Sequence, residues 1–211
     1  MTAENMLLAE DLIKATLAAT TIGGVEGAAG SSLRTRALER VSRSLSAGAD
    51  PSLSAKCSIA GSKTSALVLA AAKNDVECLR LLAASPQADL DRLDPNGYTA
   101  LLAAAHFGGA EAVRILLSAG ADPNIAGLNG WNALMNAIWS VNYESCAELA
   151  PLTNLEHLTL NGKDVHDLAS ADNGDFRAQI QGLLASQAEA NALAKSCSDA
   201  PNATARQPLA L

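Results

Sequence analysis

The sequence contains few aromatic residues: only 3% of its 211 residues are Phe, Trp or Tyr, although 49% are hydrophobic. Most of the apolar side chains are therefore short. A single globular core built from so few large side chains would be thin for a chain of this length. A row of small interfaces, each closed by alanine and leucine, needs no large side chains. The composition favours such a row.

A basic surplus and long apolar runs are also missing. The formal net charge is −7 and the sequence pI is about 4.9, which argues against a phosphate-binding surface because such a surface needs clustered Lys and Arg. No apolar run approaches the roughly 18 residues of a membrane span. Acidic residues stand near the N-terminus, where a signal peptide carries positive charge. We expect neither nucleic acid nor a membrane as partner, and no cleaved export signal.

The residues that usually carry chemistry are scattered. The cysteines have no metal-ligand spacing, and the histidines occupy unrelated positions: Cys57, Cys78, Cys146 and Cys197; His106, His157 and His166. No zinc-protease or nucleophile-elbow motif is present in the sequence. The sequence predicts no metal, no cofactor and no enzymatic activity. Cysteines of this kind, two of them inside expected helices, suit a reducing compartment, so we expect a cytoplasmic protein, with the nucleus as an alternative.

Residues 94–124 form a clear helix–turn–helix pattern. Thr99 is placed to cap a helix over residues 100–107, which Gly108 and Gly109 end. A second helix over residues 110–119 carries Val113, Leu116 and Leu117 on one stripe. Gly120 then supplies the left-handed residue that closes that helix. A hairpin turn is expected over residues 121–124.

The pattern recurs along the chain. Gly97 and Leu101 return as Gly130 and Leu134 after 33 residues, and Gly162 follows Gly130 after 32. Residues 67–71 lie 34 residues before residues 101–105. The spacing and the motif resemble ankyrin repeats. The resemblance implies an all-α solenoid of about five stacked repeats joined by short hairpin loops, with degenerate repeats as terminal caps.

The same resemblance gives the expected organisation of the chain. The ankyrin-repeat domain spans residues 1–197 and a disordered tail follows; the parts are a cap at 2–58, repeats at 59–91, 92–124 and 125–156, a C-terminal repeat or cap at 157–195, and the tail at 198–211. In the first cap we expect helices over residues 2–20 and 32–47, with the glycine-rich residues 21–30 in neither helix. In the last cap a helix begins near Asp175 and carries Phe176, Ile180, Leu183 and Leu184 at helical spacing.

The copies depart from the family at one place. The usual Thr-Pro-Leu-His opening reads Thr99-Ala100-Leu101-Leu102 here, so the family's hydrogen bond from threonine to histidine is missing. The last copy, with residues 164–167 at this position, departs further. We therefore expect a stack of modest stability whose weakest interface lies toward the C-terminus.

In ankyrin proteins, partners usually contact the hairpin tips and the concave side of the first helices. By register, the resemblance assigns partner binding to Tyr98, Phe107, Trp131, Trp139, His106, Leu93, Asn96, Leu128 and Asn129, with Pro95, Ser140, Thr64, Ala72 and Lys73 at the remaining contact positions. Four of the chain's six aromatic residues fall on these positions, and aromatic residues are enriched at binding hot spots. The alternative is that the rings only brace neighbouring repeats.

The charges suggest the chemistry of a partner. The hairpin acids Asp89, Asp91, Asp94 and Asp122 favour a protein partner with basic residues at its rim, although Asp94 could instead cap its own turn. A basic stretch, Arg34, Arg36, Arg40, Arg43, Lys56 and Lys63, is either a solvated helix face or a contact for an acidic segment. Asn124 resembles the hairpin asparagine that a dioxygenase hydroxylates in ankyrin proteins; the alternative is an ordinary turn residue.

These expectations define a class of function. We expect a monomeric, non-catalytic adaptor or scaffold that binds a partner protein. The alternatives are a regulator or inhibitor of a partner enzyme, and a structural or assembly module without a ligand of its own.

Overall fold

Helices dominate the chain and come in pairs. The computed structural model describes residues 3–22, 28–56, 63–170 and 175–198. The first helices of the pairs are α1 (Ala3–Ile22), α3 (Ala66–Ala72), α5 (Ala100–Phe107), α7 (Ala133–Trp139) and α9 (Val165–Ala169). The second helices are α2 (Ala28–Ser46), α4 (Val76–Ala83), α6 (Ala110–Ser118), α8 (Tyr143–Leu149) and α10 (Asp175–Ser198).

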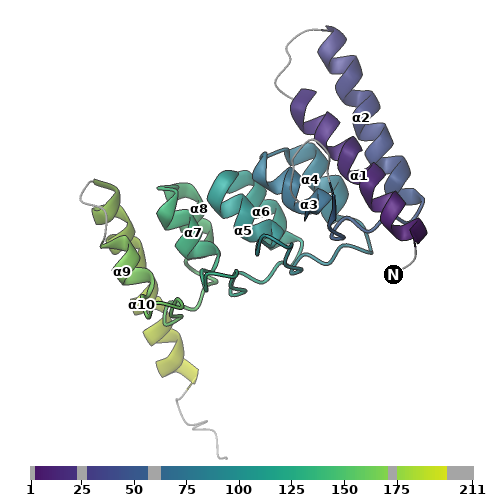
Figure 1. Ribbon diagram of the computed structural model, residues 1–211. Coiled ribbons are helices and arrows are strands. Elements are labelled where there is room, and N and C mark those ends of the chain that lie inside the picture. Colours follow the sequence, from purple (N-terminus) through teal and green to yellow (C-terminus); the bar gives the residue numbers. More distant parts are fainter. Residues whose placement is uncertain (1–2, 23–27, 57–62, 171–174, 199–211) are drawn as a thin grey trace, which may run out of the picture.

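The pairs stack in one row (Figure 1). The first helices contact one another in chain order, from α1 through α3, α5 and α7 to α9, and the second helices do so from α2 to α10. The connecting hairpins lie on one side of the row, at the bottom of Figure 1. Strand structure in the described residues is one short antiparallel ladder between β1 (Ala55–Lys56) and β2 (Lys63–Thr64). The fold is the predicted all-α solenoid.

Local signals set the ends of the short helices. The Thr99 hydroxyl accepts a hydrogen bond of 3.2 Å from the amide of Leu102, as predicted, and Ser65 and Asn132 cap α3 and α7 in the same way. Such a cap is worth about 1 kcal/mol. At the other end of the repeat, Gly120, which follows the C-cap residue Ala119 of α6, adopts a φ of 99°, the left-handed conformation expected of it.

Small residues let neighbouring pairs approach closely. Ala103, Ala104 and Ala105 in α5 are all buried. A Cβ atom on Gly108 would lie 2.5 Å from the carbonyl oxygen of Ala71, so the backbones of two repeats nearly touch there. The composition therefore follows from the packing: alanine and glycine fill the interfaces where larger side chains would hold the helices apart.

The hairpin turns repeat the same geometry three times. The amides of Asp94, Gly127 and Thr159 donate to the carbonyls of Tyr98, Trp131 and Lys163 at 2.8, 3.0 and 2.8 Å. The turn glycine, Gly97, Gly130 or Gly162, has a φ of 82°, 76° or 71°. Each turn therefore places the residue after its glycine, Tyr98, Trp131 or Lys163, directly before the N-cap residue of the first helix.

The N-terminal cap differs from its prediction. Helix α1 continues to Ile22 and α2 begins at Ala28, so part of the glycine-rich stretch is helical, and residues 23–27 lie outside the described residues. Packing explains the extension, because Ala19 in the last turns of α1 is fully buried, and burial along a long helix pair outweighs a glycine penalty of about 1 kcal/mol.

The last helix begins where the sequence predicted it. Helix α10 starts at Asp175 and buries Ile180 and Leu184, with Phe176 and Leu183 half-buried. It includes Ser198, the first residue of the expected tail, and residues 199–211 lie outside the described residues.

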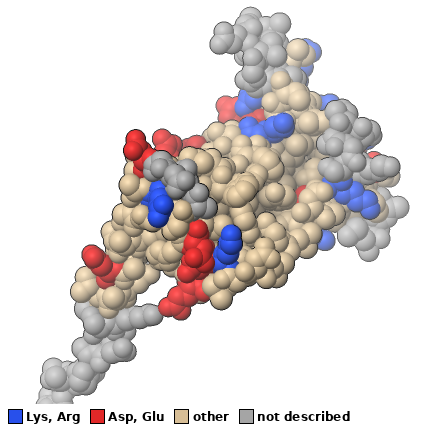
Figure 2. Space-filling view, turned by 60° about the vertical axis from the view of Figure 1, so that its left-hand side comes forward, with Lys and Arg blue, Asp and Glu red and all other residues tan. Residues whose placement is uncertain are grey.

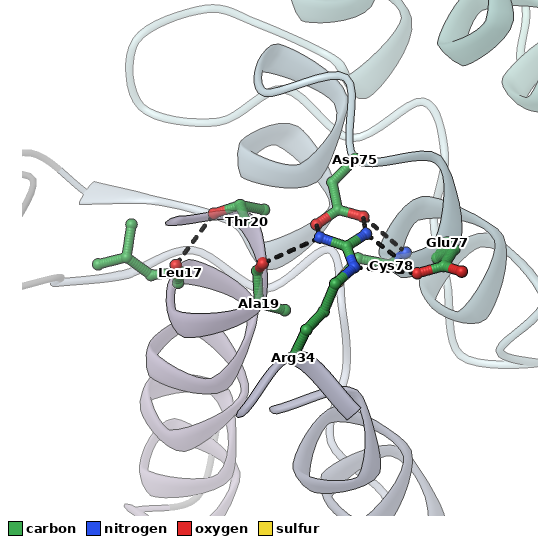
Figure 3. A network of polar contacts seen from close by, with 7 residues as sticks. All are labelled: Leu17, Ala19, Thr20, Arg34, Asp75, Glu77 and Cys78. Carbon is green, nitrogen blue, oxygen red and sulfur yellow. Dashed lines mark hydrogen bonds and ion pairs between the residues drawn. The ribbon is translucent and has the colours of Figure 1, made fainter. Parts of the chain in front are cut away.

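A partly buried ionic network joins the first cap to the next repeat (Figure 3). The Arg34 guanidinium in α2 bonds to the carboxylates of Asp75 at 2.9 Å and Glu77 at 3.1 Å, and to the carbonyl of Ala19 at 3.2 Å. Asp75 also caps α4 by accepting from the amide of Cys78 at 3.1 Å. Arg34, a member of the predicted basic stretch, therefore has a structural role.

Candidate partner-binding surface

The predicted aromatic residues gather into two groups, one in each of two adjacent repeats. In the first group, the Phe107 ring lies 5.7 Å from the Tyr98 ring and 4.2 Å from the His106 ring, measured between centroids. In the second group, Trp131 and Trp139 meet edge to face with centroids 5.3 Å apart. Such ring pairs hold each other in a preferred orientation, and they contribute stabilisation beyond that of the area that they bury.

Each group combines a half-buried ring with an exposed one. Tyr98 and Trp131 each lie just before the N-cap residue of their helix and pack against the core. Phe107 and Trp139 end the same helices, and their side chains are 57% and 64% exposed. The half-buried rings therefore brace the exposed ones. A bracing role accounts for Tyr98 and Trp131 but leaves Phe107 and Trp139 in water.

The predicted hairpin residues lie at the tips. Leu93, Asn96 and Asn129 are exposed, and Leu128 is 69% exposed. The Asn96 side-chain amide donates to the carbonyl of Lys63 at 3.0 Å, and the Asn129 side chain accepts from the Trp131 amide at 3.1 Å. The asparagines therefore shape the turns as well as standing on the surface.

At some of the predicted contact positions, the side chain already makes hydrogen bonds within the fold. Thr64 is buried and its hydroxyl donates to Asp94 at 3.2 Å. The Ser140 hydroxyl donates to the carbonyl of Ala105 at 2.9 Å. His106 is half-buried, and its Nδ1 atom is buried without a hydrogen-bond partner among the described residues. Pro95 and Lys73 are exposed, while Ala72 is half-buried.

The carboxylates of the hairpin acids accept hydrogen bonds from backbone amides. Asp94 is buried, and its carboxylate accepts from the amides of Asn96 and Tyr98 at 2.9 and 3.0 Å, which is the turn-capping role that the sequence allowed. The Asp91 carboxylate accepts from the amide of Asp122 at 2.9 Å. Asp89 accepts from the amide of Asp91 at 3.3 Å. Part of the acidic surplus therefore stabilises turns.

Asn124 links two successive hairpins. Its side-chain oxygen accepts from the amide of Asn154 at 2.6 Å, and its side-chain nitrogen lies 3.4 Å from the carbonyl of Leu152. The side chain is exposed. These bonds account for an asparagine at this position, and its hydroxylation stays a prediction.

A groove that the sequence did not predict lies beside the second aromatic group. It has a volume of about 370 Å³ between α7 and α9. Trp131, Ile138, Trp139, Val141, Leu168, Ala169 and Phe176 form its apolar lining, and Thr159, Asn161 and Lys163 its polar part. Phe176 comes from α10, so its place depends on how the last pair folds back; an aromatic residue at the start of that helix was the available signal.

The reactive side chains can be located in three dimensions for part of the set, because Cys57 and the side chain of Cys197 lie outside what the structure describes. The described residues contain no cluster of three or more His, Cys, Asp or Glu side chains that could hold a metal ion. Burial raises the pKa of the Cys78 and Cys146 thiols to about 12, so neither is a thiolate at neutral pH. In the part of the chain that is described, no helix is both long and apolar enough to cross a bilayer.

Uncharged residues make up most of the face seen in Figure 2, and the acidic and basic side chains stand in small groups. Several of the charges pair between second helices: Arg80 with Glu111 at 2.8 Å, and Arg114 with Glu148 at 3.1 Å. Exposed pairs of this kind contribute little to stability.

Comparison with known proteins agrees with this architecture. A family model described as ankyrin repeats (3 copies) matches residues 34–127 and 67–157. A protein of Treponema pallidum (strain Nichols), named as ankyrin repeat-containing, is 48% identical over 52 residues. That match covers 24% of this chain and 17% of the Treponema protein, so the chain spans only a small part of that relative's length.

Proposed function

Since the chain belongs to the ankyrin-repeat family, whose repeats generally mediate protein–protein interaction, we propose that it binds a partner protein through its two aromatic groups and the adjoining hairpin tips. In this proposal it acts as a monomeric adaptor or scaffold in the cytoplasm and has no catalytic activity of its own. Members of the family are typically interaction modules without enzymatic activity.

The exposure of Phe107 and Trp139 carries the proposal. Two large rings stand in water in adjacent repeats of a chain that has only two phenylalanines and two tryptophans. Burying such a side chain on binding is worth about 1.5–3 kcal/mol. Because Tyr98 and Trp131 hold the exposed rings in place, little rotamer entropy is lost when a partner covers them.

The exposed leucines extend the same surface. Leu128 at one hairpin tip and Leu160 at the next are both exposed, and they occupy the same register position. A partner that covers the rings and the tips together would exclude water around them, which is the arrangement in which central aromatic residues contribute most to affinity.

A pull-down from a lysate of the source organism tests the proposal. The baits are the wild type, Phe107→Ala, Trp139→Ala and Trp131→Ala, with Leu33→Ala as a matched control because Leu33 is exposed on α2 of the first cap. We expect a partner that the wild type and Leu33→Ala retain, and that Phe107→Ala or Trp139→Ala loses at an unchanged melting temperature. Variants that melt earlier but keep every partner would support the structural alternative.

A further inference from the structure

Val141 has a strained backbone at the edge of the groove. It follows α7 and has a φ of 56°, in the left-handed region that β-branched residues rarely adopt. The same register position holds Asn74, with a φ of 51°, in the second repeat, whereas Gly108 in the third repeat has a φ of −88°. Asparagine tolerates the left-handed region and Gly108 avoids it, so the repeat does not account for a left-handed valine.

The Val141 side chain contributes to the groove instead. It is 57% exposed and lines the groove beside Trp139. A residue that strains the backbone and also exposes an apolar side chain to water gains nothing for the free chain, and such strain clusters at binding sites. The strain at Val141 is therefore an observation in favour of a ligand site at the groove, and it is separate from the shape of the groove.

The charges around the groove point to the chemistry of the occupant. Lys163 is the only charged side chain that lines it in the described part of the chain, and it is exposed. The neighbouring acids Asp164 and Asp167 do not line the groove, and the carboxylate of each accepts a hydrogen bond from the backbone amide of the other, at 2.7 and 3.2 Å, in the cap of α9. In the two preceding repeats the position of Lys163 holds Tyr98 and Trp131.

We propose that this groove binds a short linear segment of the partner protein, which inserts one large apolar side chain against Trp131 and Trp139 and places an adjacent carboxylate on Lys163. The inference rests on the proposed function and specifies the partner's chemistry at one end of the surface. A volume of about 370 Å³ lies at the lower end of the range for ligand pockets, so it suits an anchor side chain and its neighbours rather than a whole domain. The groove continues the aromatic surface, because Trp131 and Trp139 belong to both.

The chain offers a direct signal for this site. Its only two tryptophans, Trp131 and Trp139, both line the groove, so intrinsic tryptophan fluorescence reports on the groove and on the second aromatic group, and not on the group around Phe107. The probe is a phage-displayed library of random dodecapeptides, selected on the full chain. Enriched peptides without tryptophan are then synthesised and titrated while the emission of the chain is recorded.

We expect the enriched peptides to share a large apolar residue next to Asp or Glu, and to shift the tryptophan emission. Lys163→Glu weakens their binding at least tenfold, whereas Lys14→Glu, the same charge change on an exposed lysine of α1, leaves it within twofold. Val141→Asn relieves the backbone strain, so it raises the melting temperature and yet weakens binding several-fold. If Val141 served only the fold, a substitution that raises the melting temperature would not also weaken peptide binding.

Three results would overturn the inference. These are peptides enriched in Lys or Arg beside the anchor, binding that Lys163→Glu and Trp139→Ala leave unchanged, and a selection that yields no peptide dependent on Trp139. If binding of the enriched peptides, or of the pull-down partner, is lost in Phe107→Ala and kept in Trp139→Ala, the groove is not the binding site. The proposed function would still stand in that case. If the chain binds neither peptides nor a partner through any of the rings, both fail.

Discussion

Single residues in the hairpins meet two constraints at once. The turn glycine at position 130 has a φ of 76°, and a Cβ atom there would lie 2.8 Å from the backbone nitrogen of Leu160 in the next hairpin. Glycine is therefore required both by the conformation of its own turn and by the approach of the neighbouring one. At Gly182, inside α10, neither constraint holds, because a Cβ atom there has no neighbour within 4 Å.

These two glycines give a matched pair of substitutions. Gly130→Ala should lower the free energy of unfolding by about 2 kcal/mol or more, because left-handed strain alone costs about 1–2 kcal/mol and the contact with Leu160 adds to it. Gly182→Ala should raise it by about 0.5–1 kcal/mol through helix propensity. Urea unfolding of both variants measures the difference. Equal effects would show that the hairpins are not stacked as described.

The buried thiols predict a pH dependence. Burial raises the pKa of Cys78 and Cys146 in the folded chain from 9.0 to about 12. The unfolded chain therefore ionises first as the pH rises, so the stability that these thiols contribute is complete below pH 9 and is lost between about pH 9 and 12. Unfolding free energies of the wild type and of Cys146→Ala, measured between pH 7 and 11, should fall less steeply for the variant. Parallel curves would contradict a buried, neutral thiol.

At the scale of elements, most helices are too short to be stable alone. Helices α3 to α8 have seven to nine residues, and isolated helices under about 12 residues are marginal in water. Their stability comes from caps and from contact with the next pair. The Arg34 network is the clearest contact of this kind, because it ties α2 to the capping carboxylate of α4.

Removal of Arg34 should uncouple the first cap. The Asp75 side chain is only 3% exposed, so Arg34→Ala leaves a buried carboxylate without its partner and should cost about 2–4 kcal/mol. Hydrogen exchange should rise most in α1 and α2. Arg36→Ala, an exposed arginine on the same helix, is the control and should change stability by less than about 0.5 kcal/mol. A similar loss in both variants would mean that the network contributes nothing specific.

Local signals explain which elements could be predicted from the sequence. The bounds of α5 follow from Thr99 and Gly108, and the sequence predicted them correctly because a cap and a stop lie within one helix. The ends of α1 and α2 were missed, since they depend on packing between two long helices. The groove was missed for the same reason: Phe176 and Lys163 come together only when the last pair stacks, and the left-handed φ of Val141 has no signature in a valine.

At the scale of the whole molecule, the row of pairs should not be uniformly stable. Helix α9 has five residues and belongs to the copy that departs furthest from the repeat pattern, whereas α5 is packed on both sides by α3 and α7. Amides of α9 should therefore exchange faster than those of α5 in native-state hydrogen exchange. Equal protection throughout would mean that the stack unfolds as a single unit, contrary to a weak C-terminal interface.

The central claim is that a stack of helix pairs holds two ring groups open to a partner. The most direct test is the affinity of the recovered partner for the wild type and for the double variant Phe107→Ala/Trp139→Ala, measured beside their melting temperatures. We predict that the double variant binds at least about 30-fold more weakly, corresponding to a hot-spot loss of about 2 kcal/mol, at an unchanged melting temperature. Equal affinity together with a lower melting temperature would contradict the account.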